Sequence, residues 1–180
     1  PKLWSPSNPS LYNLNIQLLK DGNTIDSYDL DIGIREIQAK NGQIYLNGEK
    51  IELKGFGRHE DSPVTGRGKN LPQTIKDHNL LKWIGANSYR TAHYPYSEED
   101  LELADRNGFL VVDEIPAVGL FFDDEEKNIE TRLNLCKSQL KKLINRDKNH
   151  PSVIMWSVAN EPFPPDLQNR MQSGNNKEVD

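Results

Sequence analysis

Four short apolar runs with the length of β-strands recur along the second part of the sequence. They occupy residues 51–56, 87–92, 109–115 and 153–158. The segments between them carry apolar residues at helical spacing, so strands and helices alternate along the chain. Such alternation is typical of parallel strands joined by right-handed helical crossovers. We therefore expect an α/β fold in this part of the chain.

The number of strand–helix units indicates which α/β fold this is. A complete (β/α)8 TIM barrel takes about 250 residues, whereas residues 54–180 offer four such units. The last ten residues, 171–180, are mostly polar and show no pattern for a fifth strand. The sequence therefore predicts the first half of a TIM barrel, strands one to four, and we expect the chain to be part of a longer protein.

The first 37 residues follow a different pattern. Residues 11–19 and 27–34 alternate between apolar and polar side chains, and turn-forming residues separate the two runs. Alternation with a period of two is typical of antiparallel strands with one covered face, as in a β-sandwich. We place a domain boundary here, with sandwich strands in residues 1–37 and the half barrel in residues 38–180.

The run that leads to Glu161 is the strongest indication of a catalytic site. Residues 153–158 read as a strand covered on both faces of a parallel sheet, and Pro162 then prevents further strand pairing. Asn160 and Glu161 would lie at the carboxyl end of this strand, where α/β folds place their chemistry. A carboxyl group there would be partly desolvated, which suits it to donating a proton. The alternative is a solvated strand-end glutamate without a role.

Polar residues also follow the other three strands, so their side chains would share one rim. Arg90 is either a site residue or the ion-pair partner of a neighbouring carboxylate, and His93 is either a site residue or a hydrogen-bonded rim histidine. Asp113 and Glu114 alternate along their strand, so at most one of them faces the barrel interior. After the first strand, Arg58 is either a substrate contact or the partner of a nearby acid. The acids considered for Arg58 are Glu60 and Asp61.

Composition excludes several classes of function. The net charge of -5 argues against a nucleic-acid-binding protein, whose binding face would be basic. The single cysteine, Cys136, excludes an internal disulfide and a multi-thiolate metal site. The four histidines lack the spacing of a zinc site, so we expect no metal and no other cofactor. No apolar run reaches the roughly 20 residues of a membrane span, and no signal peptide is visible, which favours a cytoplasmic protein.

Four motifs together resemble the central region of glycoside hydrolase family 2. They are GFGRHED at 55–61, WIGANSYRTAHYPYSEEDLELAD at 83–105, GFLVVDEIPAVGL at 108–120 and RDKNHPSVIMWSVANEP at 146–162. The amino-terminal strands resemble the end of the immunoglobulin-like sandwich domain of this family. The resemblance covers nearly the whole chain, and several motifs occur in the same order.

The resemblance implies a retaining β-glycosidase, with Glu161 as the general acid/base. It also implies that Asn160 contacts the sugar 2-hydroxyl and that Arg90 and His93 line the sugar subsite. Retaining hydrolysis needs a second carboxylate as nucleophile. In the family this residue lies on the seventh strand, so no residue of this chain is assigned to the role. The chain alone is therefore expected to be inactive. The favoured substrate is a small-molecule β-glucuronide. The alternatives are a β-galactosidase of the same family or a non-catalytic sugar-binding fragment. The parent enzyme is expected to be a homo-oligomer.

Overall fold

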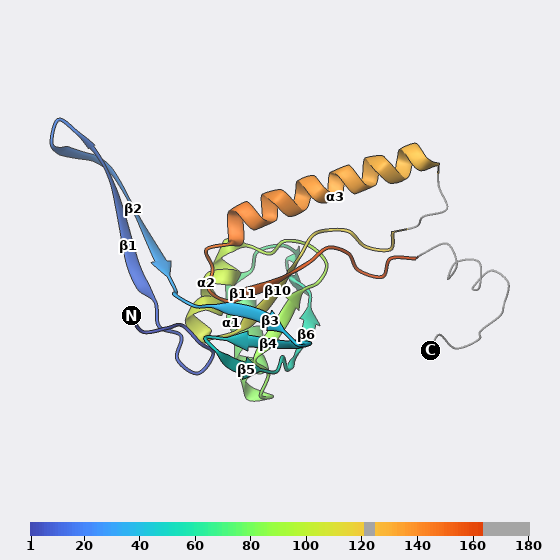
Figure 1. Cartoon of the computed structure of the whole chain (residues 1–180), viewed down its shortest axis with the longest axis horizontal. Coiled ribbons are helices and arrows are strands. Elements are labelled where there is room, and N and C mark those ends of the chain that lie inside the picture. The colour runs from blue at the N-terminus through green and yellow to red at the C-terminus, as the bar shows by residue number, and fades with distance from the viewer. Residues whose placement is uncertain (121–124, 164–180) are drawn as a thin grey trace.

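The centre of the protein is a parallel sheet of four strands with helices in the connections between them. The computed structural model describes residues 1–120 and 125–163. Its strands are β6 (Gly55–Arg58), β9 (Ser88–Thr91), β10 (Leu110–Glu114) and β11 (Val153–Ser157). Each pairs in parallel with the next one in the chain. This arrangement matches the first half of a TIM barrel, as the sequence predicts (Figure 1).

Two helices lie in the first two crossovers. Helix α1 (Leu71–Trp83) follows Asn70, whose side chain accepts a hydrogen bond from the backbone of Gln73 at 3.2 Å. Helix α2 (Glu98–Asn107) ends at Gly108, which has a positive φ of 74°. A Cβ atom at Gly108 would lie 2.4 Å from the carbonyl oxygen of Pro6, so both backbone angle and space require glycine here.

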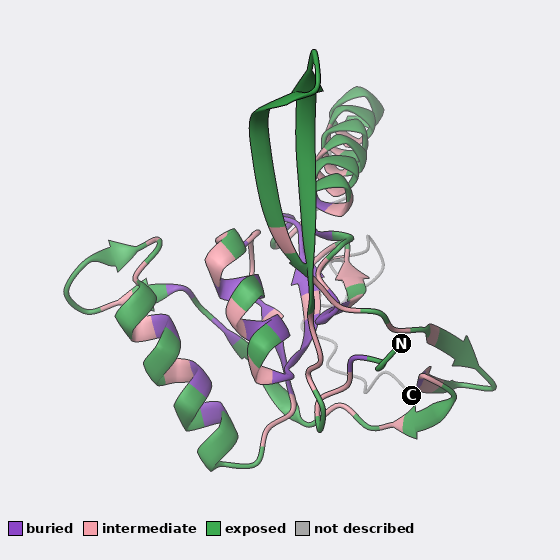
Figure 2. Cartoon of the chain, turned by 90° about the vertical axis from the view of Figure 1, so that its left-hand side faces the viewer, coloured by how far each residue is buried: buried purple, intermediate pink, exposed green. Residues whose placement is uncertain are grey.

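The core between these helices and the sheet is apolar and aromatic. In Figure 2 the buried residues concentrate in the sheet and along one side of the two shorter helices. The largest cluster of buried side chains joins both helices to β9, β10 and β11. Its members are Leu81, Tyr89, Tyr96, Leu101, Ala104, Phe109, Val111 and Val153.

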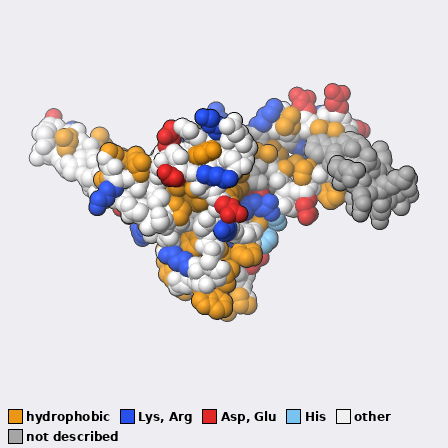
Figure 3. Space-filling view, turned by 60° about the horizontal axis from the view of Figure 1, so that its bottom comes forward, with side chains coloured by type: hydrophobic (Ala, Val, Ile, Leu, Met, Phe, Trp, Pro, Cys, Tyr) orange, Lys and Arg blue, Asp and Glu red, His pale blue; other side chains and the backbone are white. Residues whose placement is uncertain are grey.

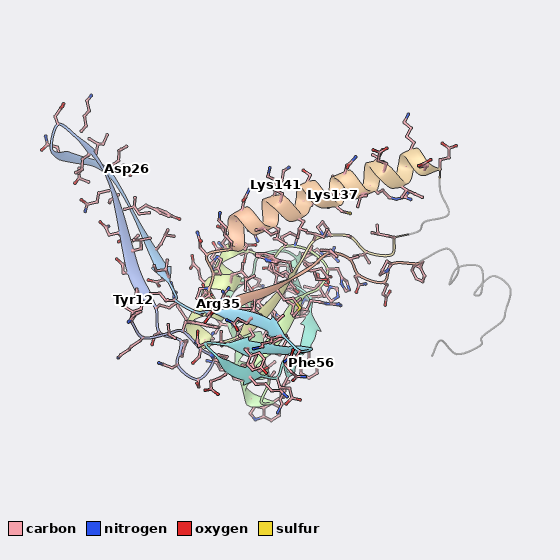
Figure 4. The ribbon with its side chains drawn as sticks, in the orientation of Figure 1. Tyr12, Asp26, Arg35, Phe56, Lys137 and Lys141 are labelled. Atoms are coloured by element: carbon pink, nitrogen blue, oxygen red, sulfur yellow. The ribbon has the colours of Figure 1, made fainter. Side chains whose placement is uncertain are left out.

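Helix α3 (Glu126–Asp147) forms the third crossover and extends well beyond the sheet (Figure 1). The sequence predicts one apolar face on this helix, and only its carboxyl-terminal part is fully packed. Leu143 is buried beside Ile115 and Ala117, whereas Leu133 near the other end is 50% exposed. Lys137 and Lys141 lie on the helix between these parts (Figure 4).

Residues before the barrel form two separate antiparallel elements. Strands β1 (Tyr12–Lys20) and β2 (Asn23–Ile32) make a long hairpin that projects from the body, with Tyr12 at its base and Asp26 near its tip (Figures 1 and 4). Strands β3 (Ile37–Lys40), β4 (Gln43–Leu46) and β5 (Glu49–Ile51) form a meander. The Asn-Gly pairs at 41–42 and 47–48 adopt positive φ at both residues, as tight hairpin turns require.

The hairpin differs from the rest of the protein because all of its β1 residues are exposed. Leu14, Ile16 and Leu18 share one face, and Tyr28 lies opposite Ile16 on β2. Apolar side chains are visible along this arm and on the body in Figure 3. Arg35 ties the base of the hairpin to the body by donating a hydrogen bond to the carbonyl of Pro151 at 2.8 Å.

Two sequence predictions about strands need correction. The run at 51–56 is not one strand, because β5 ends at Ile51 and β6 begins at Gly55. The second correction concerns β11, which was expected to be covered on both faces. Met155 is 38% exposed and Val158 is 57% exposed, since β11 is an edge strand with β10 as its one neighbour in the described sheet. A short hairpin of β7 (Asp61–Ser62) and β8 (Gly66–Arg67) completes the described strands.

Candidate active site

The carboxyl ends of the parallel strands bring together residues that are distant in the sequence. Arg90, on β9, donates a hydrogen bond from Nη2 to Oδ1 of Asn160 at 3.1 Å. Its Nε lies 3.4 Å from Oε2 of Glu114, at the end of β10. Arg90 is therefore the ion-pair partner of a strand-end carboxylate, one of the two roles that the sequence left open, and it also contacts Asn160, while its role as a site residue stays a prediction.

Asn160 is held firmly by the backbone around it. Its N–H donates to the carbonyl of Ala117 at 2.8 Å, and its carbonyl accepts from the N–H of Gly119 at 2.9 Å. The side chain is buried and its oxygen accepts from Arg90. The amide nitrogen of Asn160 is thereby left as the donor group of this side chain.

Glu161 follows Asn160 directly and has an unusual backbone conformation. Its φ is +48°, in the left-handed region that non-glycine residues rarely occupy. Glu161 is exposed, so the partial desolvation expected from a strand-end position is not met within the described residues. The reason is that the strand ends at Ser157, four residues earlier, on the open edge of the sheet.

His93 joins the same group through a buried acid. Its Nδ1 lies 2.7 Å from Oε1 of Glu114, whose side chain is fully buried. The His93 side chain keeps 24% of its surface exposed, so a ligand can reach part of the ring. The ring of His59 packs edge-on against His93 with 5.1 Å between ring centroids.

Sequence reasoning did not select Glu114 and Ser157 as site residues. Ser157, the last residue of β11, donates a hydrogen bond from its hydroxyl to Oε2 of Glu114 at 2.6 Å. Strand alternation limited the barrel interior to one of Asp113 and Glu114 but did not say which. Whether Asp113 or Glu114 faces the interior depends on the register of β10, which the sequence does not specify.

Asp113 has a different environment from its neighbour. Its Oδ1 accepts from the hydroxyl of Thr91 at 3.1 Å, and its other neighbour is the carboxyl group of Asp147, the last residue of α3. Burial, together with the neighbouring Asp147 carboxylate and its negative charge, raises the pKa of Asp113 to about 7. Arg146 pairs with Asp147 through two hydrogen bonds of 2.6 and 2.8 Å.

Arg58 is not part of the rim. Its guanidinium is buried and forms ion pairs with Asp100, from α2, and with Asp77, from α1, where the distance is 3.1 Å. Burial alone would lower the pKa of Arg58, but the adjacent Asp100 carboxylate outweighs it and raises the pKa above its usual value. Both predicted partners are therefore wrong, because β6 turns this side chain toward the helices.

The described part of the chain contains no obvious metal site. No three His, Cys, Asp or Glu side chains in residues 1–120 and 125–163 lie close enough to hold an ion. No helix within the same ranges is long and apolar enough to cross a bilayer.

Comparison with known protein families identifies this arrangement. Residues 37–180 match the family description "Glycosyl hydrolases family 2, TIM barrel domain", and residues 1–35 match "Glycosyl hydrolases family 2". The chain belongs to glycosyl hydrolase family 2. The resemblance noted in its sequence motifs is thereby confirmed, as is the fold of a partial TIM barrel preceded by strands.

Two relatives within family 2 carry the same name. A beta-glucuronidase of Paenibacillus borealis is 50% identical over 169 residues, which cover 89% of this chain and 28% of the relative. The beta-glucuronidase of Rattus norvegicus is 45% identical over 165 residues, again 89% of this chain and 25% of the relative. The chain thus spans between a quarter and a third of the length of these family 2 relatives.

Solved structures of family 2 enzymes give the same result. The β-D-glucuronidase of Dictyoglomus thermophilum matches with a TM-score of 0.81 and 48% identity, covering 96% of this chain and 31% of that chain. The enzyme of Ruminococcus gnavus in complex with D-glucuronic acid matches with a TM-score of 0.83 and 39% identity, over 96% of this chain and 30% of that chain.

Proposed function

We propose that this chain carries the acid/base half of a retaining β-glucuronidase. The observation that carries the proposal is the 50% identity, over 169 residues, to a protein named beta-glucuronidase. The geometry of the strand ends supports it, because Arg90 and Glu114 connect His93 to Asn160, the residue directly before Glu161.

In the proposed reaction, Glu161 donates a proton to the glycosidic oxygen as the bond to the aglycone breaks. The same side chain then removes a proton from the water that attacks the covalent glycosyl-enzyme. Exposure of Glu161 at the open edge of the sheet is compatible with access by substrate and water. Its positive φ turns the backbone just after the fixed Asn160, so the carboxyl group follows a rigid segment.

Asn160 and Arg90 bind the sugar in this proposal. Because Arg90 donates to Oδ1 of Asn160, the amide nitrogen of Asn160 is free to donate to the 2-hydroxyl oxygen of the sugar. Hydrogen bonds to this hydroxyl strengthen in the transition state of glycoside hydrolysis. Arg90 and His93 would line the remaining wall of the subsite.

The nucleophile of a retaining enzyme must be a second carboxylate about 5 to 5.5 Å from the acid/base. We assign no residue of this chain to that role, because the described sheet has four of the eight strands of a barrel. We infer that residues 1–180 alone do not turn over glycosides. The complete enzyme would require the remaining strands of the barrel.

The test is a set of kinetic assays with p-nitrophenyl β-D-glucuronide, β-D-galactoside and β-D-mannoside. The protein is produced with any flanking sequence that its gene encodes, and residues 1–180 alone are assayed beside it. Turnover of the glucuronide alone is the expected result. Glu161→Gln should greatly reduce kcat, because kcat includes the hydrolysis of the glycosyl-enzyme, in which Glu161 acts as the base. Preferential turnover of the galactoside, or full activity of Glu161→Gln, would contradict the proposal.

A further inference from the structure

Glu114 is the buried centre of the candidate site, and its two oxygens have different partners. Oε2 accepts from the hydroxyl of Ser157 at 2.6 Å and lies 3.4 Å from Nε of Arg90. Oε1 faces Nδ1 of His93 at 2.7 Å. Oε2 of Glu114 is therefore occupied by one hydrogen-bond donor and one ion-pair partner, and Oε1 is left for the histidine ring.

We propose that Glu114 is a positioning residue that holds His93 in the tautomer with its proton on Nδ1, so that Nε2 accepts a hydrogen bond from a sugar hydroxyl. The part that concerns the sugar rests on the proposed function. The part that concerns the tautomer depends only on the contacts of Glu114.

The direction of the hydrogen bond follows from the donors present. An ionised carboxylate only accepts hydrogen bonds, and arginine only donates them. The positive charge of Arg90 balances the negative charge of Glu114 without a second cation. In the neutral His93 ring, the single proton must therefore lie on Nδ1, where it is donated to Glu114.

The groups that face His93 come from β10 and from the loop after β6. Glu114 comes from β10, and His59 comes from that loop, with its Nδ1 3.9 Å from Asp61. Arg90, on β9, pairs with the other oxygen of Glu114. Among these neighbours, Glu114 is the acceptor at hydrogen-bond distance from the ring. A neutral His93 with Nδ1 occupied in this way has Nε2 as its remaining polar atom, and part of the ring is exposed.

Replacing Glu114 with glutamine gives a sharp prediction. The glutamine oxygen should occupy the Oε2 position, because Ser157 donates a hydrogen bond there and the Arg90 guanidinium, which has only donors, lies 3.4 Å away. The amide nitrogen then faces Nδ1 of His93 and donates to it. The neutral ring must respond by moving its proton to Nε2, which turns the sugar-facing nitrogen from an acceptor into a donor.

The experiment reads the tautomer directly. The protein, with any flanking sequence that its gene encodes, is labelled with 15N-histidine and two-bond 1H–15N correlations are recorded at about pH 8, above the ordinary histidine pKa. Signals of His93 are assigned by their loss in His93→Gln. Asp113→Asn is the matched control, because it changes the adjacent buried acid whose partners are Thr91 and Asp147.

We expect the proton on Nδ1 in the unsubstituted protein and in Asp113→Asn, and on Nε2 in Glu114→Gln. A proton on Nε2 in the unsubstituted protein, or the same tautomer in all three proteins, would overturn the proposal. Should Glu114→Gln fail to fold, the spectrum of the unsubstituted protein still decides the matter, since Nδ1 protonation is required there.

Kinetics then test the consequence for the sugar. Glu114→Gln should lower kcat/KM for a glucuronide roughly 10- to 100-fold, the size expected for losing one buried hydrogen bond and mispairing another. Asp113→Asn should change it less than about threefold. The tautomer measurement needs no turnover, so a failure of the proposed function, seen as full activity in Glu161→Gln, is distinguishable from a failure of this inference.

Discussion

Asp113 and Glu114 are neighbours on β10 and are equally buried, yet their surroundings are opposite in character. Glu114 faces one cation and two further polar partners, Arg90, His93 and Ser157. Asp113 faces a second acid, Asp147, whose own cation partner is Arg146. Burial alone therefore does not decide what an acidic side chain does, because the partners that the fold brings to it determine its charge and its use.

The largest expected effect is the contribution of Asp113 to the pH dependence of the free energy of unfolding. The pKa of Asp113 is raised from 3.8 in an unfolded chain to about 7. The bound proton therefore stabilises the folded protein fully below about pH 4, and this contribution is lost as the pH rises toward 7. The amide in Asp113→Asn stays neutral at every pH. From pH 4 to pH 8, the parent should therefore lose up to about 4 kcal/mol more of its free energy of unfolding than Asp113→Asn does. Urea unfolding at a series of pH values measures this, and parallel curves for the two proteins would contradict it.

Removing the Glu114 carboxylate should lower the free energy of unfolding at every pH at which Arg90 is charged. Glu114→Ala leaves the Arg90 guanidinium and the His93 ring without their shared partner, and we expect a loss of about 3 kcal/mol in the free energy of unfolding. The value is below that for a fully buried pair because Arg90 is 38% exposed. Urea unfolding at pH 7 provides the measurement. A loss under about 1 kcal/mol would mean that Glu114 is not needed to hold the rim together.

Thr91 contacts both Asp113 and the backbone of Glu114, so its substitution should affect the surroundings of both residues. Its hydroxyl donates to Asp113 at 3.1 Å and accepts from the backbone N–H of Glu114 at 2.8 Å. Thr91→Val keeps the shape but leaves that N–H unpaired, which should cost about 2 kcal/mol. Since the Thr91 hydrogen bond lowers the pKa of Asp113, its loss should raise that pKa further. The pH at which stability declines would then shift upward in Thr91→Val, and a downward shift would contradict the assignment.

The smallest effect is expected at Ser157. Ser157→Ala removes the hydroxyl donor at Oε2 of Glu114 while the ion pair with Arg90 remains, so we expect a loss of about 1 kcal/mol in the free energy of unfolding. The tautomer of His93 should stay unchanged, because the carboxylate still accepts from Nδ1. A tautomer change in Ser157→Ala would show that Arg90 alone does not fix the charge on Glu114.

Much of the fold follows from local signals in the sequence. The alternation of strands and helices in the second part of the chain and the parallel order of its four strands are predicted correctly. These features depend on periodicity within each segment. The domain boundary near residue 37 stays a prediction.

What the sequence did not predict depends on contacts between distant segments. Arg58 pairs with Asp100, 42 residues away, and no local pattern distinguishes that acid from Glu60 or Asp61. Glu114 could not be separated from Asp113 without the register of β10 against its neighbours. The exposure of β11 was missed for the related reason that an apolar run does not reveal whether a further strand lies beside it.

The central claim is that Glu161 donates a proton to the leaving group, and the dependence on leaving group tests it most directly. kcat/KM of the protein and of Glu161→Gln is measured for p-nitrophenyl β-D-glucuronide, whose leaving group needs little protonation, and for an alkyl β-D-glucuronide, whose leaving group needs it fully. General acid catalysis contributes roughly 10²- to 10⁴-fold. We predict a loss of that size in Glu161→Gln for the alkyl substrate and a loss within roughly tenfold for the p-nitrophenyl substrate. An equal loss on both substrates would contradict the assignment of Glu161 as the acid.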